Sequence, residues 1–167
     1  MNKTGVIYGI NGPVVYLKGN TGFKMSEMVY VGKERLVGEV IALTKDTTTV
    51  QVFEETTGLK PGETVTASGD ALSVTLGPGI LNNIFDGIER PLSEIAKQSG
   101  KYISRGLTVD SLDTEKKWDV HVTVSEGEEL MGGAIIAETQ ETRSIVHKSM
   151  VPPDFNGTVI WAAKDGK

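Results

Sequence analysis

The sequence predicts an all-β protein. Short runs rich in Val, Ile, Thr and Tyr recur along most of the chain and are separated by turn residues. Glycine accounts for 20 of the 167 residues, as expected of a chain with many turns, and 38% of the residues are hydrophobic, which suits a folded protein. Helical spacing of apolar residues occurs only in two short stretches, at 80–85 and 92–97.

Residues 1–75 are predicted to form a small closed β-barrel. Turn signals such as Asn11-Gly12-Pro13 separate the strand-like runs, and Val50 and Val52 alternate with polar neighbours, as in a strand with one buried face. Because closure removes exposed strand edges, short strands at such regular spacing favour a barrel over an open sheet. The predicted strands cover residues 6–8, 14–17, 28–31, 36–43, 47–53, 64–66 and 72–76.

Residues 76–110 are predicted to form a connector with a short helix. The turn signals Gly77-Pro78-Gly79 and Asp86-Gly87 enclose apolar residues at helical spacing, which predicts one or two helical turns over 80–85. Such a short helix is not stable alone, so its apolar face must be buried against something larger. A second helical segment is predicted over 92–97 and ends by Gly100. The apolar connector residues are Ile80, Leu81, Ile84, Phe85 and Ile88.

Residues 111–167 are predicted to form a second, strand-rich unit that begins near Trp118. Strands are expected over 120–124, around Leu130, and over 134–137, 145–147 and 158–161. This order resembles the flattened barrel-sandwich of lipoyl and biotinyl domains, where a glycine-containing turn precedes a hairpin and a Pro-then-Gly pair precedes the returning strand. Pro153 and Gly157 supply such a pair here.

Composition excludes several functional classes. The net charge is −5, so the chain lacks the basic surface that nucleic acid or an anionic membrane requires. It contains no cysteine, which excludes disulfides and thiolate metal sites and is compatible with a reducing cytosol. No segment approaches the ~18 consecutive apolar residues of a membrane span, so direct membrane insertion is not expected.

The sequence predicts no catalytic, cofactor-binding or metal-ligating residue. A phosphate loop of the form Gly-x-x-x-x-Gly-Lys-Ser/Thr is absent, and Gly77-Pro78-Gly79, the nearest glycine-rich candidate, lacks both the Lys and the hydroxyl partner. We therefore interpret this segment as a structural turn.

Acidic and histidine side chains also receive structural interpretations. Glu54 and Glu55 are adjacent, so on a strand they point to opposite faces, and we expect a solvated strand end or a subunit contact. His121 and His147 are the only histidines, too few for a metal site without carboxylate help, and both are predicted to be structural.

Two alternatives remain open from the residues alone: a lipoyl- or biotinyl-like carrier domain and a small stand-alone nucleotide-binding protein. A carrier needs one exposed Lys at a hairpin tip, whereas residues 138–143 contain none, and Lys148 is flanked by His147 and Ser149 rather than by the methionines of the biotin motif. The missing phosphate loop opposes the second alternative, which measurable ATP turnover would support.

Three stretches in order along the chain, 51–63, 76–92 and 147–153, closely resemble the N-terminal portion of the catalytic A subunit of rotary V-type and archaeal-type ATPases. The resemblance implies that residues 1–75 are the N-terminal barrel, that 76–110 belong to the nucleotide-binding domain of the full subunit, and that 111–167 are the bulge. It also implies that the parent subunit couples ATP hydrolysis or synthesis to H⁺ or Na⁺ transport. ATP and Mg²⁺ would bind to segments C-terminal to the bulge. The N-terminal portion that this chain resembles is therefore expected to be a non-catalytic assembly region.

The same resemblance implies partners and a location. The barrel would pack beside those of B subunits, the bulge would be free to contact peripheral stalk subunits, and the complex would place the chain in the cytoplasm, peripheral to the membrane. Without the rest of the full-length protein, the apolar connector residues would need another cover, so we expect collapse onto the bulge or self-association through this surface.

Overall fold

The computed structural model describes residues 3–19 and 21–166, and the chain divides into two compact units. The first unit comprises Met1–Val74 and Phe85–Val109, and the second comprises Thr75–Ile84 and Asp110–Lys167. The predicted connector, 76–110, is therefore shared between the two units. Met1, Asn2 and Asn20 of the predicted barrel and Lys167 of the predicted bulge lie outside the described residues.

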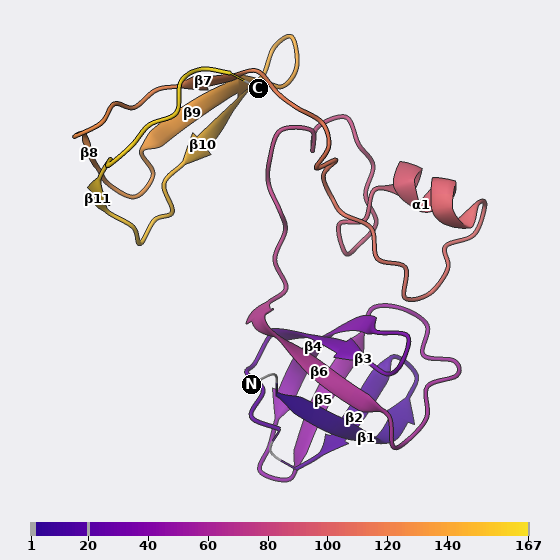
Figure 1. Cartoon of the computed structure of the whole chain (residues 1–167). Coiled ribbons are helices and arrows are strands. Elements are labelled where there is room, and N and C mark those ends of the chain that lie inside the picture. Colours follow the sequence, from indigo (N-terminus) through magenta and orange to yellow (C-terminus); the bar gives the residue numbers. More distant parts are fainter. Residues whose placement is uncertain (1–2, 20, 167) are drawn as a thin grey trace. The chain divides into compact units, whose positions relative to one another are not determined.

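A closed six-stranded barrel forms most of the first unit (Figure 1). The strand order is β1-β2-β5-β4-β3-β6, and the antiparallel pairing of β1 with β6 completes the circle. The strands are β1 (Thr4–Asn11), β2 (Val14–Lys18), β3 (Glu27–Val31), β4 (Leu36–Leu43), β5 (Thr47–Val52) and β6 (Thr64–Ala71).

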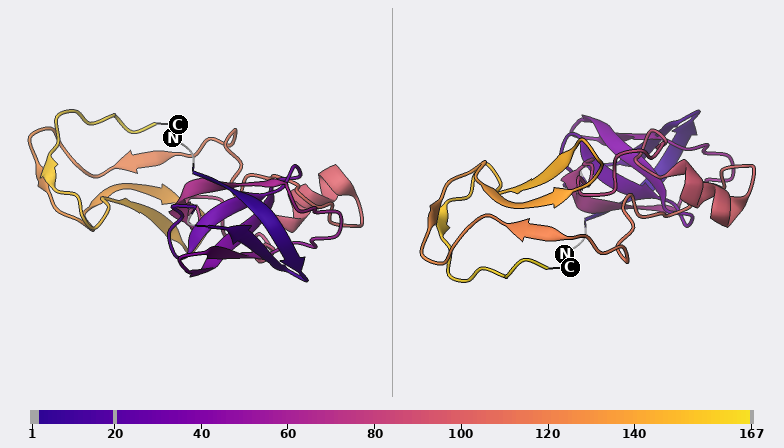
Figure 2. Two further views of the ribbon diagram at one scale, coloured as in Figure 1. Left: turned by 90° about the horizontal axis from the view of Figure 1, so that it is seen from below. Right: turned by 90° about the horizontal axis from the view of Figure 1, so that it is seen from above.

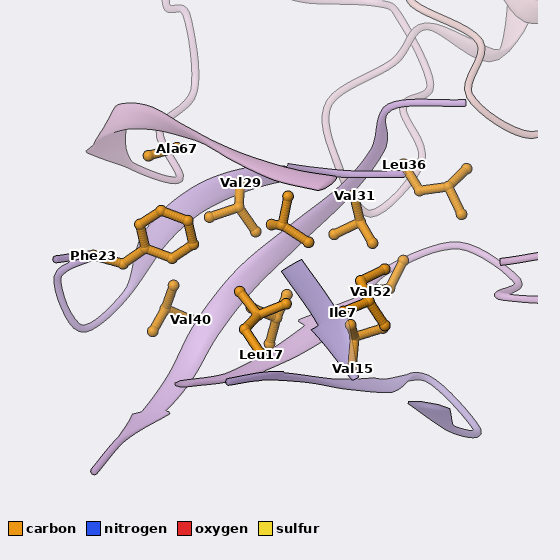
Figure 3. Close-up of a cluster of buried hydrophobic side chains, with 12 residues drawn as sticks. Ile7, Val15, Leu17, Phe23, Val29, Val31, Leu36, Val40, Val52 and Ala67 are labelled. Carbon is orange, nitrogen blue, oxygen red and sulfur yellow. The ribbon is translucent and has the colours of Figure 1, made fainter. Parts of the chain in front are cut away.

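The barrel interior is filled by aliphatic side chains from every strand. Val50 and Val52 of β5 are buried while Gln51 between them is exposed, so the period-two pattern read from the sequence is confirmed. Figure 3 shows side chains of this core, among them Leu17 and Val40, converging inside the barrel. The core cluster comprises Ile7, Val15, Leu17, Phe23, Val29, Val31, Leu36, Val40, Val50, Val52, Val65 and Ala67.

The predicted strand over 72–76 is wrong. β6 continues past its predicted end as far as Ala71, and the next five residues are irregular and exposed. Val74 and Leu76 are 61% and 72% exposed. The alternation of apolar residues there is real, but β6 already pairs with β1 and β3, so the closed barrel leaves no strand edge for residues 72–76.

The predicted helix over 80–85 is also wrong, whereas the second helical prediction is confirmed. Asn82 has a positive φ of 67°, and the side chain of Asn83 donates to the carbonyl of Gly79 at 2.7 Å, which holds the segment in a turn. Further along, α1 (Leu92–Ser99) buries Ile95 and ends at Gly100, whose φ of 73° is left-handed.

The second unit contains two small sheets, one with strand order β10-β9-β7 and one with β11-β8. Near the C-terminal end of the chain, a segment returns alongside β7 (Figure 2). There, Val120 and Gly166 form an isolated β-bridge. Among the described residues, every buried hydrophobic side chain belongs to the first unit. The strands are β7 (Val120–Val122), β8 (Glu129–Leu130), β9 (Ile135–Gln140), β10 (Val146–Met150) and β11 (Gly157–Thr158).

The all-β fold class is confirmed by these elements. Eleven strands and one short helix make up the regular structure of the described residues. The first unit contains the expected small barrel.

Candidate functional site

Arg90 is the centre of a buried charge cluster in the first unit. Its Nε lies 2.8 Å from Asp86 Oδ2 and its Nη1 lies 3.5 Å from Glu54 Oε2. Nη1 also donates to the carbonyl of Leu107 at 2.9 Å. The Arg90 and Glu54 side chains are each only 9% exposed. The cluster therefore fastens residues 86–90 and 107 to the loop that follows β5.

Asp86 organises the tight turn that presents Arg90. Its Oδ1 accepts hydrogen bonds from the backbone N–H groups of Ile88 and Arg90, and Glu89 within the turn has a positive φ of 63°. Burial opposes the charged carboxylate, but hydrogen bonds from the Arg90 backbone, the Arg90 guanidinium and the Ile88 N–H outweigh it and lower the pKa of Asp86. Asp86 is thus charged at neutral pH.

A second arginine adds further attachments in the same unit. Arg105 Nη2 lies 3.0 Å from Glu34 Oε2, and Nη1 donates to the carbonyls of Glu55 and Thr57. The N–H of Gly106 donates to Glu54 Oε2 at 3.0 Å. Arg90, Arg105 and Gly106 together hold residues 86–107 against the barrel.

These contacts correct the interpretation of Glu54 as a solvated strand end. Glu54 follows β5 directly and is buried in a cluster within the chain. Glu55 is exposed, and its carboxylate accepts from the hydroxyl of Thr57 at 2.5 Å. The two carboxylates therefore have separate surroundings and do not form an acid/base pair.

In the second unit, the carboxylate of Glu141 binds the glycine turn. Glu141 Oε1 accepts from the N–H groups of Gly79 and Leu81 at 2.8 and 3.0 Å, and the Glu141 side chain is only 4% exposed. These two donors are the kind of backbone groups that a phosphate would need. Because a carboxylate of the same chain already occupies them, the turn does not fit the phosphates of ATP.

Replacing Glu141 with alanine is expected to loosen this turn. The change removes two hydrogen bonds to a charged acceptor, one part-buried and one exposed, so we expect a loss of about 1–2 kcal/mol. Both tryptophans belong to the second unit, so tryptophan fluorescence during denaturant unfolding reports its stability. Glu126→Ala, an exposed acidic residue of the same unit, is the matched control and should change stability by less than about 0.5 kcal/mol. Equal stability of the two variants would contradict the anchoring role.

The two histidines lie in different surroundings. His121 is exposed, and its Nδ1 lies 2.8 Å from Asp165 Oδ2. His147 is partly buried, and its Nδ1 lies 3.9 Å from Glu141 Oε2. Neither belongs to a metal centre in the described part of the chain, where no group of three or more His, Asp or Glu side chains is placed to hold a metal ion.

The region in which a carrier domain would present its lysine has a different organisation. Lys148 lies within β10 and forms an ion pair with Glu138 of β9, with Nζ and Oε1 3.8 Å apart. The turn between these strands contains Glu141, whose carboxylate is directed at the glycine turn.

Sequence reasoning missed Arg90, Arg105 and Asp165. For Arg90 the sequence offers only the neighbouring turn signal Asp86-Gly87, which does not specify the pairing with Glu54. Within the described residues, 3–19 and 21–166, no helix has the length and apolar character needed to cross a lipid bilayer.

Two family models match consecutive parts of this chain. The beta-barrel domain of the ATP synthase alpha/beta family matches residues 7–69. The barrel-sandwich domain of the ATP synthase alpha/beta subunit matches residues 109–167, in agreement with the expected topology of the second unit.

Curated relatives cover almost the whole chain. The V-type ATP synthase alpha chain of Halothermothrix orenii is 50% identical over 100% of this chain and 28% of the relative. The A subunit of the A-type ATP synthase of Methanopyrus kandleri is 51% identical over 98% of this chain and 28% of the relative. Its counterpart from Pyrococcus abyssi is 45% identical over 100% of this chain and 16% of the relative. The chain thus spans 28% or less of the length of these relatives. It belongs to the ATP synthase alpha/beta family and matches the N-terminal region of V/A-type A subunits.

Proposed function

We propose that this chain is the non-catalytic N-terminal assembly region of the catalytic A subunit of a V/A-type ATPase. The full-length protein would bind ATP and Mg²⁺ and couple ATP hydrolysis or synthesis to H⁺ or Na⁺ transport. The observation that carries this proposal is the succession of two ATP synthase domains, barrel and barrel-sandwich, in this chain. Relatives named as ATP synthase alpha chains or A subunits match 95–100% of the chain.

The charge clusters support a scaffolding role. Arg90 and Arg105 bind their carboxylate and carbonyl partners within the first unit, and Glu141 fills the two donors of the glycine turn in the second. Each of these polar groups thus joins one segment of the chain to another. Such contacts suit a region that keeps its shape while attached domains move.

Surface composition suggests where partners bind. Val6 and Tyr8 of β1 are 53% and 51% exposed on the barrel, a suitable side for the barrel of a B subunit. In the second unit, Met131 and Trp161 are 75% and 71% exposed. Peripheral stalk subunits would bind to such exposed apolar side chains of the bulge. In this role the chain resides in the cytoplasm, peripheral to the membrane as part of the ATPase complex.

Self-association through the connector is part of the same proposal. Leu81 and Ile84 are 38% and 73% exposed, whereas Ile80, Phe85 and Ile88 are half-buried. The exposed pair would be covered by a second copy when no other subunit is present.

Calorimetric titration with MgATP, followed by mixing with a B subunit of a V/A-type ATPase, tests the function. We expect no heat of binding for the chain alone, because the turn donors are occupied by Glu141. In analytical ultracentrifugation, the mixture with the B subunit should sediment as one complex. The same measurement on the chain alone reports whether it self-associates. Tight Mg²⁺-dependent nucleotide binding by the chain would overturn the proposal in favour of a nucleotide-binding protein, and failure to associate with the B subunit would remove the assembly role.

A further inference from the structure

The segment at residues 165–166 is fastened to β7 by both a side chain and the backbone. Asp165 Oδ1 accepts from the N–H of Val122 at 2.8 Å, and Oδ2 lies 2.8 Å from His121 Nδ1. The Val120 N–H donates to the Gly166 carbonyl at 2.8 Å, and the Gly166 N–H donates to the Val120 carbonyl at 3.2 Å. The segment therefore extends the β10-β9-β7 sheet along its β7 edge (Figure 2).

A row of charged groups crosses this sheet at the same level. His121 of β7 and Lys148 of β10 both lie directly opposite Glu138 of β9. With His121 protonated, the order Asp165, His121, Glu138, Lys148 alternates in sign. With His121 neutral, Asp165 and Glu138 lie on either side of an uncharged ring, so their negative charges are no longer separated by a positive one. Asp119 lines the same surface hollow as these three residues.

We propose that His121 and Asp165 form a proton-controlled latch, which holds residues 165–166 against β7 most firmly when His121 is protonated and loosens when His121 loses its proton. Both side chains are more than half exposed, so protons and water reach them without any opening of the unit. Asp165 makes two contacts with one carboxylate, so weakening the histidine contact also weakens its hold on the Val122 N–H.

The electrostatics agree in direction with this geometry. The hydrogen bond from His121 to Asp165 and the charge of Asp165 raise the pKa of His121 above 6.5, and Glu138 adds to the rise. The hydrogen bonds from His121 and Val122 lower the pKa of Asp165 below 3.8. The latch is therefore fully formed between about pH 4 and pH 6.5, weakens as the pH rises through the raised pKa of His121, and weakens in acid as Asp165 is protonated.

Opening the latch would change a hollow of about 520 Å³ on the second unit. Asp165 and Gly166 form part of its wall, and His121, Glu138 and Thr139 contribute from β7 and β9. Release of residues 165–166 removes that wall and exposes the backbone groups of β7 that Gly166 had paired. An unpaired strand edge of this kind can accept another strand.

Nuclear magnetic resonance on the full chain tests the latch. We expect His121 to titrate above 6.5 and the protection factors of the Val122 and Gly166 amides against hydrogen exchange to fall across the same pH range. Each unit by which the His121 pKa is raised corresponds to a tenfold rise in the opening equilibrium. In Asp165→Asn, which keeps an acceptor for Val122, the His121 pKa should return towards 6.5 and the pH dependence of protection should disappear.

His147→Gln is the matched control, because it removes the other histidine and leaves the latch intact. The variant should retain the full pH dependence at Val122 and Gly166. Three results would each overturn the latch. One is a His121 pKa that is not raised above 6.5 in the unmodified chain, and another is a protection factor of the two amides that does not change as His121 titrates. The third is a pH dependence of protection that persists in Asp165→Asn.

Discussion

Replacement of Arg90 by methionine is expected to destabilise the docking of residues 86–107 on the barrel by about 3–5 kcal/mol, the usual cost of removing one partner from a buried ion pair. Methionine fills similar space but leaves the carboxylates of Glu54 and Asp86 without their shared guanidinium. Hydrogen exchange at Gly106, whose N–H donates to Glu54, measures the effect directly. The protection of this amide should fall by about two to three and a half orders of magnitude, following ~1.4 kcal/mol per factor of ten.

Lys97→Met is the matched control for the Arg90 variant. Lys97 pairs with Glu94 on the exposed side of α1, where the two side chains are 70% and 42% exposed. Such a surface pair contributes about 0–1 kcal/mol, so protection of Gly106 should be unchanged. A loss below about 1 kcal/mol in the Arg90 variant would contradict the importance of the buried cluster.

The Arg90 cluster also predicts a pH dependence. The pKa of Asp86 is lowered in the folded chain, so its contribution to stability is present above its ordinary value near 3.8 and is lost as the pH falls through the lowered pKa. As the pH falls through this lowered pKa, Gly106 of the unmodified chain should therefore exchange faster, towards the rate in the Arg90→Met variant.

Replacement of Leu17 by alanine is expected to destabilise the barrel by about 2–5 kcal/mol. Leu17 is completely buried on β2, which pairs with both β1 and β5, so the lost side chain leaves a cavity between neighbouring strands. Hydrogen exchange of the β5 amides, measured at Val50, reports the loss. Tryptophan fluorescence, which reports the second unit alone, should keep its unfolding midpoint.

Lys18→Ala controls for the position of Leu17 in the strand. Lys18 is the next residue of β2 and is exposed, so its replacement should change barrel stability by no more than about 0.5 kcal/mol. If Leu17→Ala and Lys18→Ala had equal effects, the barrel core would not be packed as Figure 3 shows.

The barrel could be predicted because its strands obey a simple local rule. In β5 the residues that alternate in hydrophobicity also alternate in burial. The same rule failed at residues 72–76, where the alternation is present but a partner strand is missing among the described elements. At 80–85 the helical spacing of apolar residues was overruled by Asn82 and Asn83, whose left-handed backbone and side-chain hydrogen bond favour a turn.

The charge clusters could not be predicted in the same way, because their members are distant in sequence. Glu141 and Gly79 are 62 residues apart, and His121 and Asp165 are 44 apart. Each pairing depends on how strands return through space, which local patterns do not specify. The turn at Gly77-Pro78-Gly79 was expected from its residues, but its carboxylate partner was not.

The pairing of β1 with β6 has a consequence for synthesis on the ribosome. Thr4 lies opposite Thr66, so the barrel cannot close until Thr66 has followed Thr4 out of the exit tunnel. Until then β1 and β3 expose edges that will later bind β6, and the nascent chain passes through a slow, aggregation-prone interval set by long-range contacts. Emergence of β6 ends this interval, so the barrel can close while the strands of the second unit are still being translated.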